Sequence, residues 1–174
     1  MPKPRKQLIS LDATPYYHCT SRCVRRASLC GRDAVTGKCF EHRRQWIEDR
    51  ILALAEVFAI DVCAYAVMSN HHHLVLHINK PKALQWTNHE VCERWQQLYK
   101  GTLLTQKFLR NEPLTEAELH AVNERLDLWR IQLCDINWFM RALNEPIARQ
   151  ANAEDQCTGR TDKRHPCHLA LRAS

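Results

Sequence analysis

The 174-residue sequence has only four glycines and no run of about 18 apolar residues. So little glycine argues against a loop-rich or low-complexity protein, and no helix is expected to cross a membrane. The basic start, MPKPRKQLIS, is not followed by an apolar segment, so we expect no secretory signal peptide. The sequence therefore predicts a cytoplasmic protein with no membrane partner and about one domain's length.

Paired Cys-x-x-Cys spacings are also missing, although the chain has nine cysteines. Most structural zinc sites use such pairs, and without a secretion signal we expect the thiols to be reduced. One zinc alternative stays open, a structural site made by Cys157, Cys167 and His168, whose spacing is poor for zinc.

What the sequence does have is a localised positive charge. Residues 1–45 contain ten Lys/Arg and three Asp/Glu, a net charge of +7, whereas the whole chain has +6. The other 129 residues therefore carry a net charge of −1, and the excess lies in the first quarter of the chain. A basic region of this kind is typical of proteins that bind a polyanion such as nucleic acid. The alternative is a solvated basic end that aids solubility.

Hydrophobic periodicity predicts strands at residues 16–24, 61–68 and 71–78, and an amphipathic helix at 41–58. Two capping boxes, Thr87 with Glu90 and Thr115 with Glu118, predict the starts of two further helices. A last helix is expected from about Asp135, with a kink at Pro146.

The order strand–helix–strand–strand–helix predicts an α+β fold, a ferredoxin-like βαββα layer of helices on an antiparallel sheet. The fourth strand of that arrangement is not apparent in the sequence, and extra helices follow the third strand. We assign residues 1–159 to the domain and residues 160–174 to an irregular basic tail.

Three consecutive histidines open the third predicted strand, HHHLVLHI. Alternate side chains of a strand face opposite ways. His71 and His73 should therefore share the open face, with Cβ atoms roughly 6–7 Å apart, whereas His72 should point into the core and be hydrogen-bonded there. Two imidazoles so placed can hold one divalent ion.

The combination of two motifs resembles the HUH single-strand nucleases and transposases. More narrowly, it is similar to the tyrosine transposases associated with repetitive extragenic palindromes, in their long-chain branch. The resemblance covers roughly residues 15–159. Its matching residues are Tyr17, His18, Thr20 and Arg22 in the first strand, Met68, Asn70, His71 and His73 around the third, and Asn144, Glu145 and Pro146 near the end.

This resemblance implies binding and cutting of single-stranded DNA next to a hairpin. By analogy, His71 and His73 hold Mg²⁺ or Mn²⁺, which polarises the scissile phosphate. Asn70 shapes the turn before the strand and touches the DNA backbone. A homodimer is an open alternative for the assembly. The expected DNA-binding residues are Asn70, His18, Arg22, Arg25 and Arg26.

The family attacks DNA with a tyrosine on a C-terminal helix, and here the chain departs from it. All four tyrosines precede residue 100, and Tyr99 is the one candidate nucleophile after the histidine strand. We expect truncation or a shifted reading frame near Arg160. Two functions stay open: a DNA-nicking transposase, and a catalytically inactive, truncated DNA-binding remnant.

Overall fold

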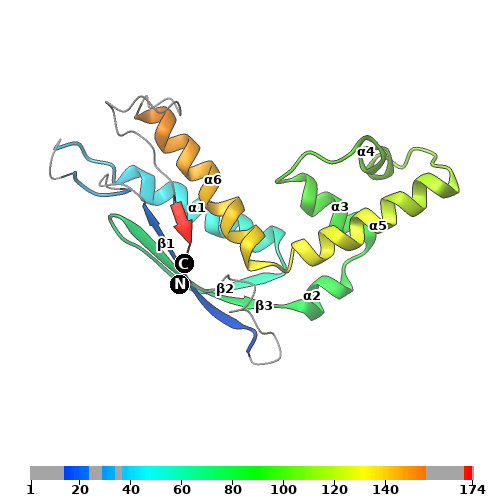
Figure 1. The fold of residues 1–174 in the computed structure, drawn as a ribbon, viewed down its shortest axis with the longest axis horizontal. Helices are drawn as coiled ribbons and strands as arrows, with labels where there is room; N and C mark the ends of the chain where they lie inside the picture. The colour runs from blue at the N-terminus through cyan, green and yellow to red at the C-terminus, as the bar shows by residue number, and fades with distance from the viewer. Residues whose placement is uncertain (1–13, 24–28, 34–36, 156–170, 174) are drawn as a thin grey trace, which may run out of the picture.

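The computed structural model describes residues 14–23, 29–33, 37–155 and 171–173, and all structural statements below concern these residues. Strands and helices alternate at first, and helices then dominate (Figure 1). The elements are β1 (Tyr16–Cys23), α1 (His42–Val57), β2 (Ile60–Val67), β3 (His71–Ile78), α2 (Lys80–Gln85), α3 (Asn88–Gln96), α4 (Leu103–Leu109), α5 (Glu116–Gln132), α6 (Ile136–Glu154) and β4 (Leu171–Ala173).

The strands form one antiparallel sheet in the order β2-β3-β1-β4. The histidine strand β3 is central, paired with β1 on one side and β2 on the other. Its predicted bounds are confirmed. The chain is thus an α+β protein with an antiparallel sheet, as expected.

A fourth strand is present, which corrects the expectation that it was missing. Leu171–Ala173 pairs with Ser21–Cys23 at the edge of the sheet, so the end of the predicted irregular tail is a strand. Three residues are too few to show a period-two pattern, so this strand could not be predicted from the sequence. The rest of that tail, up to residue 170, lies outside the described residues.

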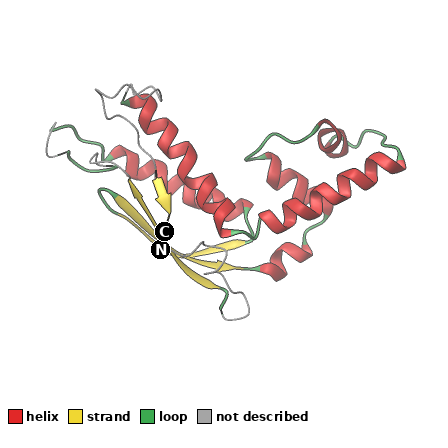
Figure 2. Cartoon of the chain, viewed as in Figure 1, coloured by secondary structure: helices red, strands yellow, loops and turns green. Residues whose placement is uncertain are grey.

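Helices α1 and α6 cover one face of the sheet, and α3, α4 and α5 form a second group beyond its end (Figures 1 and 2). The sheet contributes Leu74 and Leu76 to the core, both fully buried. Ile47 and Ile51 of α1 and Phe139 of α6 are buried in the same cluster. Burying one side chain of this size stabilises the fold by about 1.5–3 kcal/mol. The leucine face of the sheet is therefore held against the helices, and the other face stays open.

Both predicted capping boxes are present. The Thr87 and Thr115 hydroxyls accept hydrogen bonds from the backbone N–H groups of Glu90 and Glu118, and each glutamate accepts one in return. Each box satisfies two N–H groups that a helix start leaves without partners. None of the described helices is long and apolar enough to cross a membrane.

Helix α6 continues through Pro146 as one helix. Proline has no N–H, so the carbonyl four residues earlier loses its helical partner. That carbonyl belongs to Ala142, and it accepts a hydrogen bond of 3.1 Å from Nε of Arg50 in α1. The side chain from the neighbouring helix therefore replaces the missing donor and ties α1 to α6.

Candidate functional site

Alternation along β3 separates the core from an open face. His72, Leu74, Leu76 and Ile78 are buried, whereas the residues between them are half-buried. Antiparallel pairing places Arg22 of β1 opposite His71 and Thr20 opposite His73. Directly paired residues point to the same face, so these four side chains share the face opposite the buried Leu74 and Leu76. Helices α1 and α6 cover the other face of the sheet (Figure 1).

The turn between β2 and β3 is held from outside the hairpin. Ser69 O accepts hydrogen bonds from the backbone N–H groups of Leu29, at 2.6 Å, and Cys30, at 3.0 Å. The Arg44 guanidinium donates to Val67 O just before the turn. These contacts fix the position from which Asn70 and His71 leave the turn.

Asn70 orients the first imidazole of the pair. Its Oδ1 lies 2.5 Å from Nδ1 of His71. An amide oxygen only accepts, so Nδ1 of His71 carries the proton and its Nε2 keeps a free lone pair. Asn70, which the resemblance places at the turn, therefore also sets the tautomer of His71, a candidate metal ligand.

The second imidazole is oriented by β1. Nδ1 of His73 lies 2.9 Å from Nε2 of His18 and 3.2 Å from the Thr20 hydroxyl. The His18 and His73 rings stack with centroids 5.0 Å apart and planes 6° apart. His18 was expected to touch DNA, and in the structure it lies against His73.

The His71 and His73 rings meet edge to face, with centroids 5.0 Å apart. Within the described part of the chain, no hydrogen bond involves Nε2 of His71 or of His73. Burial, with the neighbouring His71, His18 and Arg22, lowers the pKa of His73, so this imidazole stays in the neutral form that binds metals. These donors fit a divalent ion, but only as part of its shell.

The described residues supply no further protein ligands for such an ion. Among the described residues, no group of three or more His, Cys, Asp or Glu side chains could hold a metal ion. An ion here would complete its shell with water or with oxygens of a bound molecule. Two imidazoles alone imply weak affinity.

Arg22 supplies the positive charge beside the pair. Its side chain is exposed, and its guanidinium is close enough to help lower the pKa of His73. Arg25 and Arg26 lie outside the described residues. Of the predicted arginine cluster, the structure therefore brings one member to the histidine pair.

His72 points into the core as expected. Among the described residues, Asn144 lies close enough to act on the ring as a weak hydrogen-bond partner, although neither ring nitrogen has a full hydrogen-bonding geometry. The Asn144 amide nitrogen donates to the Ser21 hydroxyl at 2.8 Å. Burial lowers the pKa of His72 to about 4, so the ring is neutral at physiological pH.

Tyr99 is not brought to the histidine pair. Its ring contacts Trp95, with centroids 4.7 Å apart, and Trp138 of α6, at 5.6 Å. Its hydroxyl is buried without a partner in the described part of the chain, and burial raises its pKa. Helix α6 covers the other face of the sheet (Figure 1). Of the four tyrosines, the pairing register places only Tyr16 on the open face.

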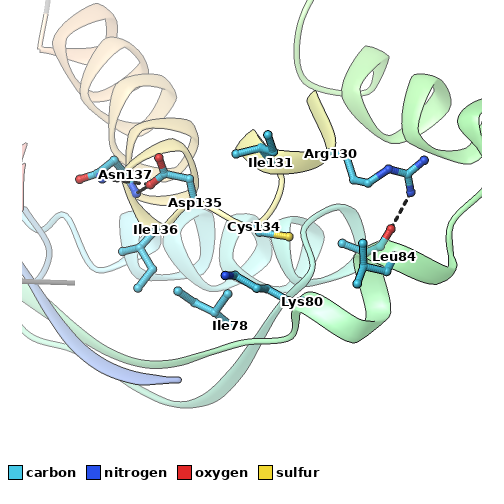
Figure 3. Close-up of a pocket in the computed structure, with 10 residues that line it drawn as sticks. Ile78, Lys80, Leu84, Arg130, Ile131, Cys134, Asp135, Ile136 and Asn137 are labelled. Atoms are coloured by element: carbon cyan, nitrogen blue, oxygen red, sulfur yellow. Dashed lines mark hydrogen bonds between the residues drawn. The ribbon is translucent and has the colours of Figure 1, made fainter. Parts of the chain in front are cut away.

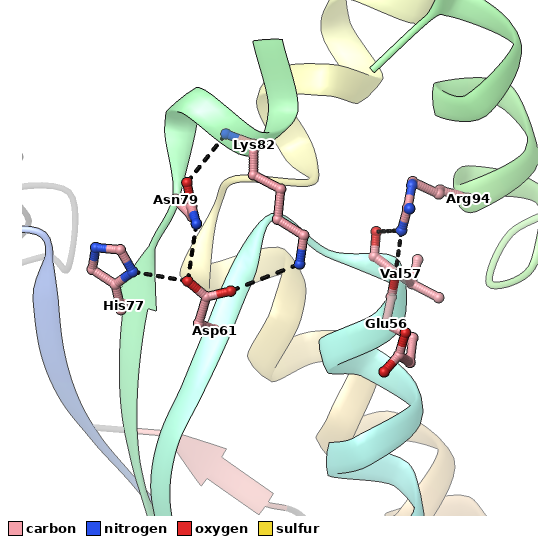
Figure 4. Close-up of polar contacts among 7 residues, drawn as sticks. All are labelled: Glu56, Val57, Asp61, His77, Asn79, Lys82 and Arg94. Carbon is pink, nitrogen blue, oxygen red and sulfur yellow. Dashed lines mark hydrogen bonds and ion pairs between the residues drawn. The ribbon is translucent and has the colours of Figure 1, made fainter. Parts of the chain in front are cut away.

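A second polar group, which the sequence did not predict, lies at the far end of the open face (Figure 4). Asp61 accepts hydrogen bonds from His77, at 2.9 Å, and Asn79, at 3.1 Å, and Lys82 is 3.7 Å away. Burial favours the neutral acid, but these partners outweigh it and lower the pKa of Asp61. The alternation along β3 could have placed His77 on the open face from the sequence alone. Its contact with Asp61 could not be predicted, because it depends on the register between β2 and β3.

A separate cavity of about 430 Å³ lies where β3, α2 and the α5–α6 junction meet (Figure 3). Leu84 and Ile131 line it and are largely exposed. Arg130 beside it donates to the carbonyls of Ala83 and Trp86, each at 2.6 Å, and so caps the end of α2. Burial raises the pKa of Cys134 in the lining.

Comparison of the chain with protein-family models, with curated proteins and with solved structures gave no significant match.

Proposed function

We propose that the chain is a transposase-like protein that binds hairpin or single-stranded DNA on the open face of its sheet. The observation that carries this proposal is the oriented pair His71 and His73. Each has its Nδ1 engaged by a neighbour and its Nε2 without a partner in the described residues, and Arg22 lies beside them. A cation and two metal-binding nitrogens on one open surface suit a phosphate.

The arrangement of the elements supports a ferredoxin-like layer. The strand order β2-β3-β1-β4, with α1 between β1 and β2 and helices between β3 and β4, is the order of the split βαβ motif. The HUH proteins that the sequence resembles are expected to share this strand order. The fold and the histidine pair therefore support the same proposal.

In this proposal, His71 and His73 hold Mn²⁺ or Mg²⁺ through Nε2. The ion's contribution when bound is to polarise a phosphate oxygen. Imidazole is a softer ligand than water or carboxylate, and Mg²⁺ prefers oxygen ligands and keeps its waters. We therefore propose Mn²⁺ as the better-bound ion. The chain itself orients the two rings through Asn70, Thr20 and His18.

DNA binding without strand cleavage is the second candidate, and the position of Tyr99 favours it. Attack on a phosphate requires a nucleophile held near the reacting atoms. Tyr99 is packed among tryptophans, and its hydroxyl is buried. The only tyrosine on the open face, Tyr16, lies at its far end.

We expect no covalent protein–DNA adduct when the chain is incubated with a labelled hairpin and Mn²⁺ and separated on a denaturing gel. Cleavage without an adduct would point to attack by water. An adduct that disappears in Tyr99→Phe but persists in Tyr65→Phe would overturn the expectation and make the chain a tyrosine transposase.

Replacing Arg22 by alanine should weaken binding to any single strand and lower the salt slope of binding by about 1. Each cation that neutralises a phosphate releases counterions, which makes affinity fall with salt. The measurement is fluorescence anisotropy of a labelled oligonucleotide at several salt concentrations. Arg149→Ala, which removes an exposed arginine of α6, is the control and should leave the slope unchanged. A salt slope of Arg22→Ala equal to that of the wild type would show that Arg22 is a solvated edge residue that contacts no phosphate.

A further inference from the structure

Two aromatic rings lie at the end of the open face that is farthest from the Asn70 turn. Tyr16 of β1 pairs directly with His77 of β3, and their ring centroids are 4.7 Å apart with planes 33° apart. Tyr16 is 55% exposed, so its ring is not part of the core. Neither residue belongs to the motifs that define the histidine pair.

The Tyr16–His77 pair is held in place before any ligand arrives. Nδ1 of His77 lies 2.9 Å from Asp61, and Asn79 and Lys82 hold Asp61 from the other side (Figure 4). These contacts fix the plane of the imidazole against which Tyr16 rests. Lys82 and Asn79 also offset the negative charge of Asp61, so a phosphate chain nearby meets less repulsion than a bare carboxylate would cause.

The pair continues a row of rings along one face. From the turn, His71 contacts His73, His73 stacks on His18, and Val75 separates them from His77. A strand rises about 3.3 Å per residue, which places His77 roughly 13 Å from His73. A stacked strand advances about 3.4 Å per nucleotide, so the distance from His73 to His77 corresponds to about four nucleotides.

We propose that Tyr16, backed by His77, is a stacking site for a nucleobase of the single strand whose phosphate lies at the histidine pair. The inference rests on the proposed function and adds the direction of the strand, from the Asn70 turn towards Tyr16. Exposed aromatic rings on a sheet are a general means of holding unpaired bases, because every base has a stacking face. The site therefore takes any base and distinguishes single strands from duplexes, whose bases are already stacked.

The test compares the affinities of full-length variants for a labelled single strand by fluorescence anisotropy. Stacking typically contributes enough that Tyr16→Ala should bind about tenfold more weakly, with an unchanged salt slope. Tyr16→Phe keeps the ring and should bind like the wild type. Tyr65→Ala is the matched control, because Tyr65 is also exposed, at 41%, but faces the other side of the sheet.

A second readout locates the contact. An oligonucleotide with 2-aminopurine at one position, moved along the strand, should show quenching that is lost in Tyr16→Leu and kept in Tyr16→Phe. Tyr16→Leu also replaces Tyr16→Ala if the alanine variant unfolds. If Tyr16→Ala and Tyr16→Leu bind the single strand as tightly as the wild type does, the stacking site is wrong and the proposed function stands. If the wild type does not bind single strands, both are wrong.

Discussion

Replacing Glu154 and Asp155 together by alanine is expected to lower the free energy of unfolding by about 3–5 kcal/mol. Arg43 of α1 is fully buried, yet it carries a charge. Its Nε donates to Glu154 at 2.7 Å and its Nη2 to Asp155 at 2.5 Å, and its guanidinium lies 4.1 Å from the centroid of the Phe40 ring. Without both carboxylates, the guanidinium would be a buried charge with no counter-ion among the described residues.

The pKa of Glu154 gives this prediction a pH dependence. Burial favours the neutral acid, but hydrogen bonds from Arg43 and His42 outweigh it and lower the pKa below its usual value. The stabilisation from ionised Glu154 is therefore present above the pKa of the unfolded carboxyl. It is lost as the pH falls through the lower, folded pKa. The wild type and the variant should differ less at pH 3 than at pH 7.

Urea unfolding followed by tryptophan fluorescence measures both quantities. The control is Glu145→Ala on the same helix, whose pair with Arg141 is exposed and should contribute only a few tenths of a kcal/mol. Equal stabilities of the wild type and the Glu154→Ala/Asp155→Ala variant at pH 7 would show that this contact does not hold α6 against α1.

Replacing either His71 or His73 by alanine should weaken Mn²⁺ binding at least about 100-fold. Loss of a group that merely orients a ligand already reduces metal affinity 10–100-fold. In the proposed site, each imidazole would supply one of the two protein nitrogens that the described residues offer. His18→Ala, which removes the ring stacked on His73, should therefore have the smaller effect. Free Mn²⁺ can be counted by electron paramagnetic resonance as protein is added.

His89→Ala is the control for this titration, because His89 is a partly exposed histidine of α3, outside the sheet. An unchanged Mn²⁺ affinity in both His71→Ala and His73→Ala would show that the ion does not bind at the histidine pair. Wild-type affinity for Mg²⁺ equal to that for Mn²⁺ would contradict the nitrogen ligands, since Mg²⁺ prefers oxygen.

Features that repeat along one element could be predicted from the sequence. The alternation of HHHLVLHI separated a leucine face from a histidine face, because a strand has a period of two. The capping boxes at Thr87 and Thr115 were equally local, since each involves residues three positions apart. Helix α2 was missed, because its six residues are too short for a periodic pattern.

Features that join distant residues could not be predicted. The contact of Arg50 with Ala142 O, the Asp61–His77 pair and the burial of the Tyr99 hydroxyl all depend on how elements pack or pair. His72 was expected to be hydrogen-bonded because buried polar groups usually are. Its neighbour in the core is Asn144, which also donates to Ser21, and this arrangement depends on how α6 packs against β1.

The most direct test of the proposed function is the affinity of the full chain for a labelled hairpin with a single-stranded flank, measured in Mn²⁺ and in EDTA. We predict that the wild type binds in both and more tightly in Mn²⁺, and that a His71→Ala/His73→Ala variant binds with the weaker, metal-independent affinity in both. Absence of binding by the wild type, or an equal gain from Mn²⁺ in the double variant, would contradict the proposal.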